Sequence, residues 1–415
     1  MKLLVAIPAL NEEDSIAAVI QRTLDARAEI SARTPVTAVD VTVVSDGSTD
    51  RTVERAGAFG SAINLIVFER NRGYGAAIME AWRQSDAELL GFLDADGTCD
   101  PRFFVELCTA IFACDAHVAL GSRMHATSRM PLFRRLGNAM FATMLTAFGA
   151  TRVRDSASGM RVVRRDCLPR LMPLPDGLHF TPAMSARAIL ADDLTIVEVE
   201  MPYQERAGRS KLRPIRDGWR FLRVILTAAF LYRPSRPLGI VALVAFASAL
   251  GWTSRLAWQY GRFGTFELWM IYHFVVIQLS ATAGVLLMIA GYLGRKAAGI
   301  TLSGHADRYR SRGPVGALFS HRAFWLVPLG LATLGTLVIA PAAVEYVKTG
   351  HVDPAAHHWS KFFAMSFAFS MALILTSARL LDITLDLLAD RVMFLKGGAS
   401  ISSEPAPARP GSPRS

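Results

Sequence analysis

The sequence predicts an α/β domain with a mostly parallel sheet, followed by an all-α domain of about four membrane-spanning helices. Short apolar runs alternate with helical segments over residues 1–215, and four long apolar stretches follow residue 235. Hydrophobic residues make up 52% of the 415 positions. Alternation of strand and helix is typical of βαβ units, and long apolar runs in an apolar chain are typical of membrane segments.

Within residues 1–215, strands are expected at 2–7, 39–44, 64–68, 89–93 and 118–121. Helices are expected between them, at 15–28, 52–59, 76–85 and 101–113. Asn11 or Asp14 is expected to cap the first helix, and Asp100 to cap the last one ahead of Pro101. The first strand-to-helix turn lacks a Gly-x-Gly-x-x-Gly pattern, which disfavours a dinucleotide-binding domain.

Asp94 and Asp96 directly follow the apolar run 89–93. Residues two apart in a strand point to the same side, and α/β proteins bind ligands at the carboxyl ends of parallel strands. Two converging carboxylates favour a hard divalent cation such as Mg²⁺ or Mn²⁺, shared with a substrate diphosphate. On this pair alone a solvated turn is the alternative, because Asp is common in turns.

The apolar stretches at 238–258, 269–294, 324–347 and 362–381 are each about the ~20 residues that cross a bilayer. Arg and Lys gather before the first, between the second and third, and after the fourth, which predicts that these segments face the cytoplasm together with domain 1–215. Residues 216–236 are expected to form interfacial amphipathic helices, residues 237–390 the transmembrane domain, and residues 391–415 a disordered cytoplasmic tail.

The net charge is +10, and the basic residues cluster near the apolar stretches and in a few cytoplasmic motifs. Lipid headgroups and a phosphorylated substrate explain this pattern better than nucleic acid does. The four cysteines fit no zinc-binding pattern and are expected to be packing residues.

Four motifs follow the strands in order: Pro8-Ala9-Leu10-Asn11-Glu12, Ser45-Asp46-Gly47-Ser48-Thr49-Asp50, Asn71-Arg72-Gly73 with Ala76-Ala77, and Asp94-Ala95-Asp96. Together they resemble the catalytic domain of glycosyltransferase family 2, which has the Rossmann-like GT-A fold. Later motifs are similar to those of the polyprenyl-phosphate glycosyltransferase branch, namely Gly121-Ser122-Arg123, Arg135 before Gly137-Asn138, Asp155 through Ser158-Gly159-Met160-Arg161, and Arg206-Ala-Gly208-Arg-Ser210-Lys211. The Gln-x-x-Arg-Trp motif of processive synthases is absent from the sequence.

The resemblance implies a nucleotide-sugar site lined by Pro8, Ala9, Leu10, Glu12, Asp46, Gly73, Asp94 and Asp96. Asp94 and Asp96 would hold Mg²⁺ or Mn²⁺ against the donor diphosphate. The acceptor phosphate would be bound by Arg123, Arg135, Arg206, Ser210 and Lys211, and the implied catalytic set is Asp96, Arg123, Arg135, Arg206 and Lys211. Thr98 stands where the family often has Gln, and Ser45, Tyr74 and Met160 are further departures.

The implied function is inverting, metal-dependent sugar transfer to a polyprenyl phosphate at the cytoplasmic face of a bacterial inner membrane. One alternative is transfer to a lipid hydroxyl of diacylglycerol, ceramide or hopanoid type, for which Asp155 is the only obvious base. Another is a non-catalytic membrane scaffold or translocation partner. The sequence leaves open whether the spans only anchor the chain or also assemble it into a homo-oligomer.

Overall fold

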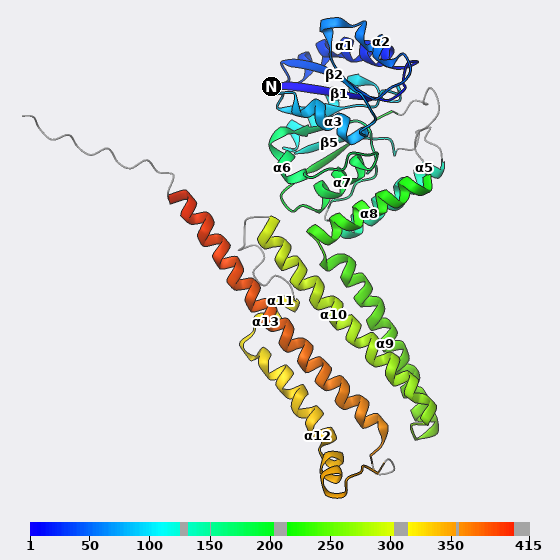
Figure 1. Ribbon diagram of the computed structural model, residues 1–415, viewed down its shortest axis with the longest axis vertical. Coiled ribbons are helices and arrows are strands. Elements are labelled where there is room, and N and C mark those ends of the chain that lie inside the picture. Colours follow the sequence, from blue (N-terminus) through cyan, green and yellow to red (C-terminus); the bar gives the residue numbers. More distant parts are fainter. Residues whose placement is uncertain (125–131, 150, 203–213, 303–313, 354–356, 402–415) are drawn as a thin grey trace, which may run out of the picture. The chain divides into compact units, whose positions relative to one another are not determined.

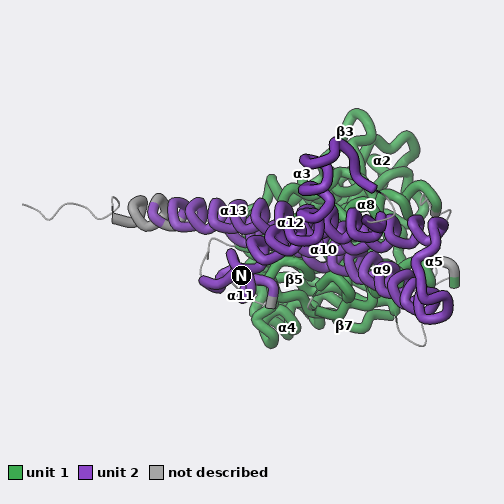
Figure 2. Tube along the Cα trace, turned by 90° about the horizontal axis from the view of Figure 1, so that it is seen from below, with its two compact units in different colours: residues 1–231 green, residues 232–415 purple. Residues whose placement is uncertain are grey.

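The computed structural model describes residues 1–124, 132–149, 151–202, 214–302, 314–353 and 357–401 (Figure 1). The chain forms two compact units, residues 1–231 and residues 232–415, which are coloured separately in Figure 2. The first unit contains the sheet and its helices, and the second consists of helices.

The sheet of the first unit has seven strands in the described part of the chain, in the order β3-β2-β1-β4-β6-β5-β7. The strands are β1 (Lys2–Ala9), β2 (Ala38–Asp46), β3 (Asn64–Phe68), β4 (Leu89–Phe92), β5 (Val118–Ser122), β6 (Arg161–Arg164) and β7 (Ile196–Glu200). β6 runs antiparallel to β4 and β5, and the other pairs are parallel. This mostly parallel mixed sheet is a GT-A fold and confirms the predicted fold class.

The helices of this unit are α1 (Ile16–Arg33), α2 (Thr52–Gly57), α3 (Tyr74–Arg83), α4 (Phe104–Ala113), α5 (Leu132–Phe148), α6 (Leu168–Leu171), α7 (Phe180–Leu190) and α8 (Pro214–Tyr232). Short 3₁₀ turns span Gly60–Ala62, Pro101–Phe103 and Arg165–Cys167. The core lies where β1 and β4 pack against α1 and α4, with Val5, Ile20, Leu89 and Leu107 buried in one cluster. Burial of each such side chain contributes about 1.5–3 kcal/mol, which fixes the central strands whose ends carry the site.

The predicted cap of the first helix is wrong. Ser15 precedes α1 without a capping side-chain bond, and its hydroxyl donates instead to the carbonyl of Ala95 at 2.7 Å. Asn11 lies in the left-handed region with φ of 49°, and its side chain accepts a bond from the Thr49 N–H at 2.8 Å. Asp100 does accept from the N–H of Arg102 at 3.0 Å, which confirms the cap before Pro101.

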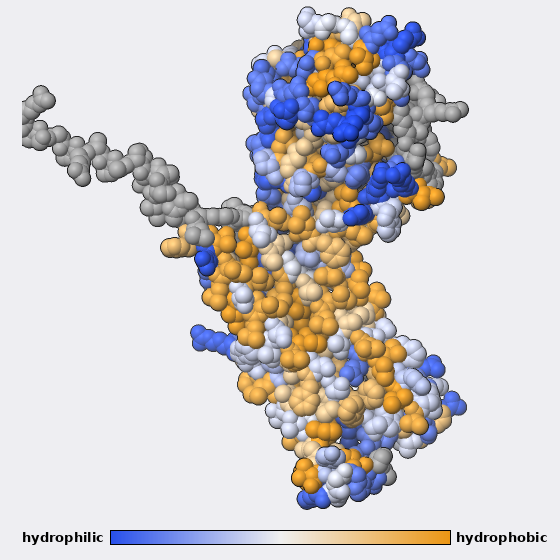
Figure 3. All heavy atoms as spheres, in the orientation of Figure 1, coloured by the Kyte–Doolittle hydropathy of each residue, from blue (hydrophilic) through white to orange (hydrophobic). Residues whose placement is uncertain are grey.

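The second unit contains α9 (Ser235–Phe263), α10 (Ile271–Leu302), α11 (Pro314–Ser320), α12 (Leu326–Thr349) and α13 (Trp359–Ile401), with 3₁₀ turns at Leu268–Met270 and Arg322–Trp325. Four helical segments are long and apolar enough to cross a membrane: Ser235–Phe263, Leu268–Leu302, Arg322–Thr349 and Trp359–Val392. Their outward surfaces are mostly hydrophobic (Figure 3). They include the four predicted spans and indicate a membrane protein.

α13 continues to Ile401, whereas the sequence predicts a disordered tail from residue 391; residues 402–415 lie outside the described part. α9 and α10 pack closely because small residues face large ones. A Cβ added at Gly284 of α10 would lie 2.7 Å from the Phe246 ring of α9. Small residues that allow helices to approach closely are typical of membrane helix pairs.

A cluster of charged side chains joins α10 to α13. Lys296 bonds to the carboxylate of Asp382 and lies 2.9 Å from Asp386. Arg379 also contacts Asp382, at 2.6 Å, and the Tyr292 hydroxyl donates to it at 2.9 Å. Lys296 and Asp382 are buried, so this ion cluster is held within the helical unit.

Candidate functional site

The turns after β1 and β2 are joined by side-chain to backbone hydrogen bonds. The Asn11 N–H donates to the Ser48 hydroxyl at 3.1 Å, and the Glu12 N–H donates to the Thr52 hydroxyl at 2.8 Å. Pro8 and Ala9 are buried at the end of β1, whereas Leu10 and Glu12 are partly exposed. The donor-site residues predicted in these two turns therefore lie together at the carboxyl ends of adjacent strands.

Asp46 holds the loop that precedes α3. Its side chain is buried, and its two oxygens accept bonds from the N–H groups of Arg72 at 2.6 Å and Gly73 at 2.9 Å. Burial raises the pKa of Asp46, and the two backbone donors oppose that rise. Gly73 has φ of +112°, a conformation that side chains rarely adopt, so this approach of the loop to Asp46 requires glycine.

Asp94 and Asp96 lie in the turn after β4, which we call the Asp94 turn (residues 94–96). Both are half-buried, and each carboxylate accepts a bond from a hydroxyl group. The Tyr74 phenol donates to Oδ1 of Asp94 at 2.6 Å, and the Thr98 hydroxyl donates to Oδ1 of Asp96 at 2.7 Å. Thr98 is itself buried, and its bond helps to hold the Asp96 carboxylate in place.

The Asp94 turn fits a hard divalent cation by the chemistry of its donors. Two half-buried carboxylates supply oxygen ligands, which Mg²⁺ and Mn²⁺ prefer. Among the described residues, no group of three or more His, Cys, Asp or Glu side chains could hold a metal ion. A cation at Asp94 and Asp96 would therefore complete its coordination with substrate oxygens and water.

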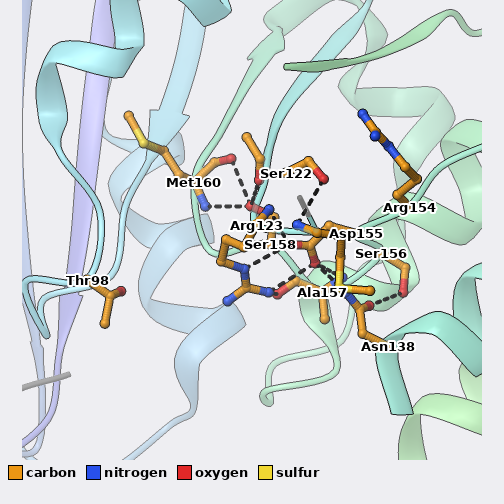
Figure 4. Close-up of polar contacts among 12 residues, drawn as sticks. Thr98, Ser122, Arg123, Asn138, Arg154, Asp155, Ser156, Ala157, Ser158 and Met160 are labelled. Atoms are coloured by element: carbon orange, nitrogen blue, oxygen red, sulfur yellow. Dashed lines mark hydrogen bonds and ion pairs between the residues drawn. The ribbon is translucent and has the colours of Figure 1, made fainter. Parts of the chain in front are cut away.

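Asp155, which is fully buried, forms an ion pair with the partly buried Arg123 beside the end of β5 (Figure 4). Arg123 donates from Nε to Oδ2 at 2.8 Å and from Nη2 to Oδ1 at 3.0 Å, and its backbone N–H also donates to Oδ2. Asn138 of α5 donates to Oδ1 at 2.8 Å. Burial alone would raise the pKa of Asp155, but the Arg123 guanidinium and these hydrogen bonds hold it below its usual value.

The segment from residue 155 to 159, called the Asp155 loop, is fixed from several directions. Arg161 is fully buried and donates to the carbonyls of Ser156 at 2.9 Å and Ser158 at 3.1 Å. Glu198 of β7 accepts from the N–H of Asp155 at 2.8 Å. A Cβ added at Gly159 would overlap the Asp94 carboxylate, so this loop lies directly against the Asp94 turn.

The structure thus brings most of the predicted donor residues together and places Arg123 in an ion pair that the sequence did not predict. Arg135 lies on α5, where it is partly buried. Arg206, Ser210 and Lys211 lie outside the described residues. Sequence reasoning missed the partnership of Asn138 and Glu198 with Asp155, and assigned Tyr74 no role. The Gly137-Asn138 motif was the one available signal, because nothing in β7 marks Glu198 as a partner.

Comparisons with known proteins bear on the family of the chain. Residues 4–171 match the model of the family described as "Glycosyl transferase family 2". A dolichyl-phosphate hexose transferase of Haloferax volcanii is 31% identical over 226 residues, which cover 52% of this chain and 89% of that protein. The low-salt glycan biosynthesis hexosyltransferase Agl6 of the same organism is 32% identical over 256 residues, 60% of each chain, so the match spans under two thirds of that relative.

An undecaprenyl-phosphate 4-deoxy-4-formamido-L-arabinose transferase of Proteus mirabilis is 26% identical over 253 residues, covering 59% of this chain and 72% of that protein. Among solved structures, glucosyl-3-phosphoglycerate synthase from Mycobacterium tuberculosis matches at 21% identity with a TM-score of 0.42, covering 55% of this chain and 80% of that one. From its sequence motifs, its GT-A sheet and these relatives, the chain belongs to glycosyl transferase family 2, in the polyprenyl-phosphate glycosyltransferase branch.

Proposed function

We propose that this protein transfers a sugar from a nucleotide-sugar donor to a polyprenyl phosphate, with inversion at the anomeric carbon and with the help of Mg²⁺ or Mn²⁺. Relatives named as dolichyl-phosphate and undecaprenyl-phosphate transferases support the acceptor class. The observation that carries the proposal is the meeting of three elements at one end of the sheet: the donor-site turns, the Asp94 turn and the Asp155 loop with Arg123.

On the donor side, the turns after β1 and β2 would receive the nucleoside. The partly exposed Glu12 offers an acceptor for its polar groups, and the buried Asp46 holds the loop at Arg72 and Gly73 in place. Asp94 and Asp96 would hold the cation at the diphosphate. A divalent cation bound there would neutralise negative charge on the leaving nucleoside diphosphate. The hydrogen bond from the Ser15 hydroxyl to the Ala95 carbonyl joins the start of α1 to the Asp94 turn and so helps to fix the backbone between the two carboxylates.

On the acceptor side, the state of Asp155 favours a phosphate over a lipid hydroxyl. A hydroxyl would need a base within hydrogen-bond reach, whereas a phosphate monoester is anionic near neutral pH and can attack directly. Asp155 is fully buried, and its two oxygens already accept bonds from Arg123 and Asn138. It is therefore a poor base, and its proposed task is to orient Arg123 so that the guanidinium faces the acceptor phosphate.

Two amphipathic helices of the first unit support membrane docking of this site. α8 exposes Ile215 and Trp219 together with Arg216 and Arg220. α5 exposes Leu132, Leu136 and Met140 at four-residue spacing, and the two helices touch through Phe141 and Phe221, whose ring centroids lie 5.9 Å apart. Apolar faces flanked by Arg are typical of helices that lie in the headgroup region.

This surface supports catalysis at a membrane face. The distribution of Arg and Lys around the spans supports the cytoplasmic side of a bacterial inner membrane.

The proposal is tested with purified full-length protein, undecaprenyl phosphate, Mg²⁺ or Mn²⁺ and a panel of nucleotide sugars, with lipid-linked product scored by mass. We expect one donor to give a product, and chelation of the metal to abolish it. Asp96→Asn is the matched variant, because it removes one charge and keeps the shape; it should lose most of the product. If diacylglycerol gave product while undecaprenyl phosphate gave none with any donor, the proposal would be wrong.

A further inference from the structure

Tyr74 connects the first turn of α3 to the candidate metal-binding turn. Its hydroxyl lies 2.6 Å from Oδ1 of Asp94. Its ring packs edge-on against Phe92, with centroids 6.4 Å apart, and against Phe180, with centroids 6.5 Å apart. The aromatic contacts fix the orientation of the ring, and this places the hydroxyl at the Asp94 carboxylate.

Gly159 lies against the same Asp94 carboxylate, nearest to its Oδ2 atom. A Cβ added there would overlap the carboxylate oxygens, so the Asp155 loop leaves no space for a side chain. The carboxylate is therefore in contact with both the Tyr74 phenol and the Gly159 backbone. A carboxylate confined in this way has little freedom to rotate about its last side-chain bond.

The Tyr74 phenol donates its proton to Oδ1 of Asp94 in this contact. A bond from a hydroxyl to a carboxylate is charge-assisted, and 2.6 Å is the length expected for that class.

The two carboxylates of the Asp94 turn receive parallel support. Thr98 donates to Asp96 from within the turn itself, at a separation of two residues. Tyr74 donates to Asp94 from a different element, twenty residues earlier in the sequence. Tyr74 also directly follows Gly73, whose N–H bonds to Asp46, so one short segment contacts both an expected nucleoside residue and an expected metal ligand.

We propose that Tyr74 is a positioning residue for metal binding: its hydroxyl holds the Asp94 carboxylate in the orientation that a divalent cation and the donor diphosphate require. This inference rests on the proposed function, because it assumes that Asp94 is a metal ligand. Partners that orient a metal ligand typically contribute 10–100-fold to metal affinity. The role is specific to the hydroxyl, since the aromatic ring alone would satisfy the packing.

The experiment compares full-length wild-type protein with Tyr74→Phe, which keeps the ring and removes the hydroxyl. Mn²⁺ alone is titrated into each protein, and free Mn²⁺ is followed by its electron paramagnetic resonance signal. We expect about 10–100-fold weaker Mn²⁺ binding in Tyr74→Phe. In transfer assays, the Mn²⁺ concentration for half-maximal rate should rise by a similar factor, while the KM for the lipid acceptor stays unchanged.

Trp82→Phe is the matched control. Trp82 packs against the same two rings, with centroids 6.0 Å from Phe92 and 5.9 Å from Phe180, and its indole N–H donates to the carbonyl of Gly91. It should keep wild-type Mn²⁺ affinity even if its thermal midpoint falls. Equal Mn²⁺ affinity in Tyr74→Phe and wild type, or equal weakening in Trp82→Phe, would overturn the inference, as would absence of Mn²⁺ binding by the wild type.

A double-mutant cycle separates the hydroxyl bond from general disturbance. In an Asp94→Asn background, Tyr74→Phe should change the remaining Mn²⁺ affinity by less than about twofold, because the charge-assisted bond is already gone. A further tenfold loss in that background would contradict the inference. Wild-type protein that binds Mn²⁺ but transfers no sugar would overturn the proposed function alone, whereas transfer with unchanged metal dependence in Tyr74→Phe would overturn this inference alone.

Discussion

Both units of the molecule bury ion pairs, but the pairs join different kinds of segment. In the first unit, Arg123 and Asp155 join the end of β5 to a loop that touches Asp94. In the second unit, Lys296 and Asp382 join two long helices. A buried charge is costly unless it is paired and hydrogen-bonded, and both sets meet that condition.

The two ion pairs differ in which part of the molecule each one holds in place. The Asp155 loop lies among the segments that carry the candidate site, so a shift of the loop moves functional side chains. The ion cluster of α10 and α13 comprises Lys296, Arg379, Asp382 and Asp386, two positive and two negative groups. It lies along regular helices, where its effect is on helix association. We therefore expect changes at the Asp155 loop to lower activity, and changes in the ion cluster of α10 and α13 to lower stability while activity is retained.

The largest effect is expected from Gly159→Ala, which tests whether the Asp155 loop positions Asp94. The added Cβ would overlap the Asp94 carboxylate, and displacement of a catalytic group by about 1 Å can reduce the rate about 100-fold. The rate of lipid-linked sugar formation is the measurement. Gly137→Ala on α5 is the control, because its Cβ would meet nothing within 4 Å and helix propensity favours alanine. Full activity in Gly159→Ala would show that the loop does not constrain Asp94.

Arg123→Gln should destabilise the first unit by about 3–5 kcal/mol, because it leaves the buried Asp155 charge without its partner. Urea unfolding of the detergent-solubilised protein, followed by fluorescence, measures the change. Arg123→Gln combined with Asp155→Asn should recover part of the loss, since a neutral pair can still form hydrogen bonds. A double variant less stable than the single one would contradict the ion-pair explanation.

The same pair predicts a dependence on pH. The folded-state pKa of Asp155 is lowered, so its contribution to stability is present above the unfolded pKa of about 3.9 and is lost as pH falls through the folded value. We expect thermal midpoints of the wild type to fall in that acid range. The fall should be shallower in Asp155→Asn, and identical pH profiles for the two proteins would be the contrary result.

Lys296→Met tests the helical side of the comparison. Arg379 stays paired with Asp382, so the variant loses charged hydrogen bonds without leaving Asp382 unpaired, at a cost of about 1.5–3 kcal/mol. The thermal midpoint in detergent should fall, while the transfer rate per folded molecule is retained. A loss of rate without a loss of stability would mean that the ion cluster acts on catalysis.

The smallest effect is expected for Arg83→Ala, which removes an exposed pair with Glu80 on α3. Exposed pairs of this kind contribute little, because water screens them. Stability and activity should both match the wild type within error. A clear loss would show that charge removal in itself perturbs the first unit, which would weaken the interpretation of the Arg123 result.

The strands and the Asp94 turn were predictable because each is a local pattern. β3 begins and ends at the predicted residues, and the four apolar helices include the predicted spans. Two strands of the sheet were not predicted. β6 has four residues, begins and ends with Arg and has no clear strand signal, and β7 is a five-residue strand that alternates apolar and acidic residues. The prediction that Asn11 caps α1 was wrong because the Asn11 side chain bonds to Thr49, a partner 38 residues away.

In the candidate site, too, local patterns were predictable and contacts between distant residues were not. Asp94 and Asp96 were predicted from two positions that lie two residues apart, whereas the pairing of Arg123 with Asp155 spans 32 residues and depends on β5 and the Asp155 loop meeting. Arg161 is an ordinary surface residue by type, but the fold buries it fully. Thr98 was a doubtful metal ligand by sequence, and the structure shows its hydroxyl bonded to Asp96.

The central claim is that the acceptor's own phosphate is the nucleophile and that Asp155 is not a base. The most direct measurement compares two acceptors that differ in one group, undecaprenyl phosphate and undecaprenol, with the same donor, metal and full-length protein. The account predicts glycosylated product from the phosphate and none from the alcohol. Product from undecaprenol at a comparable rate, abolished by Asp155→Asn, would contradict it.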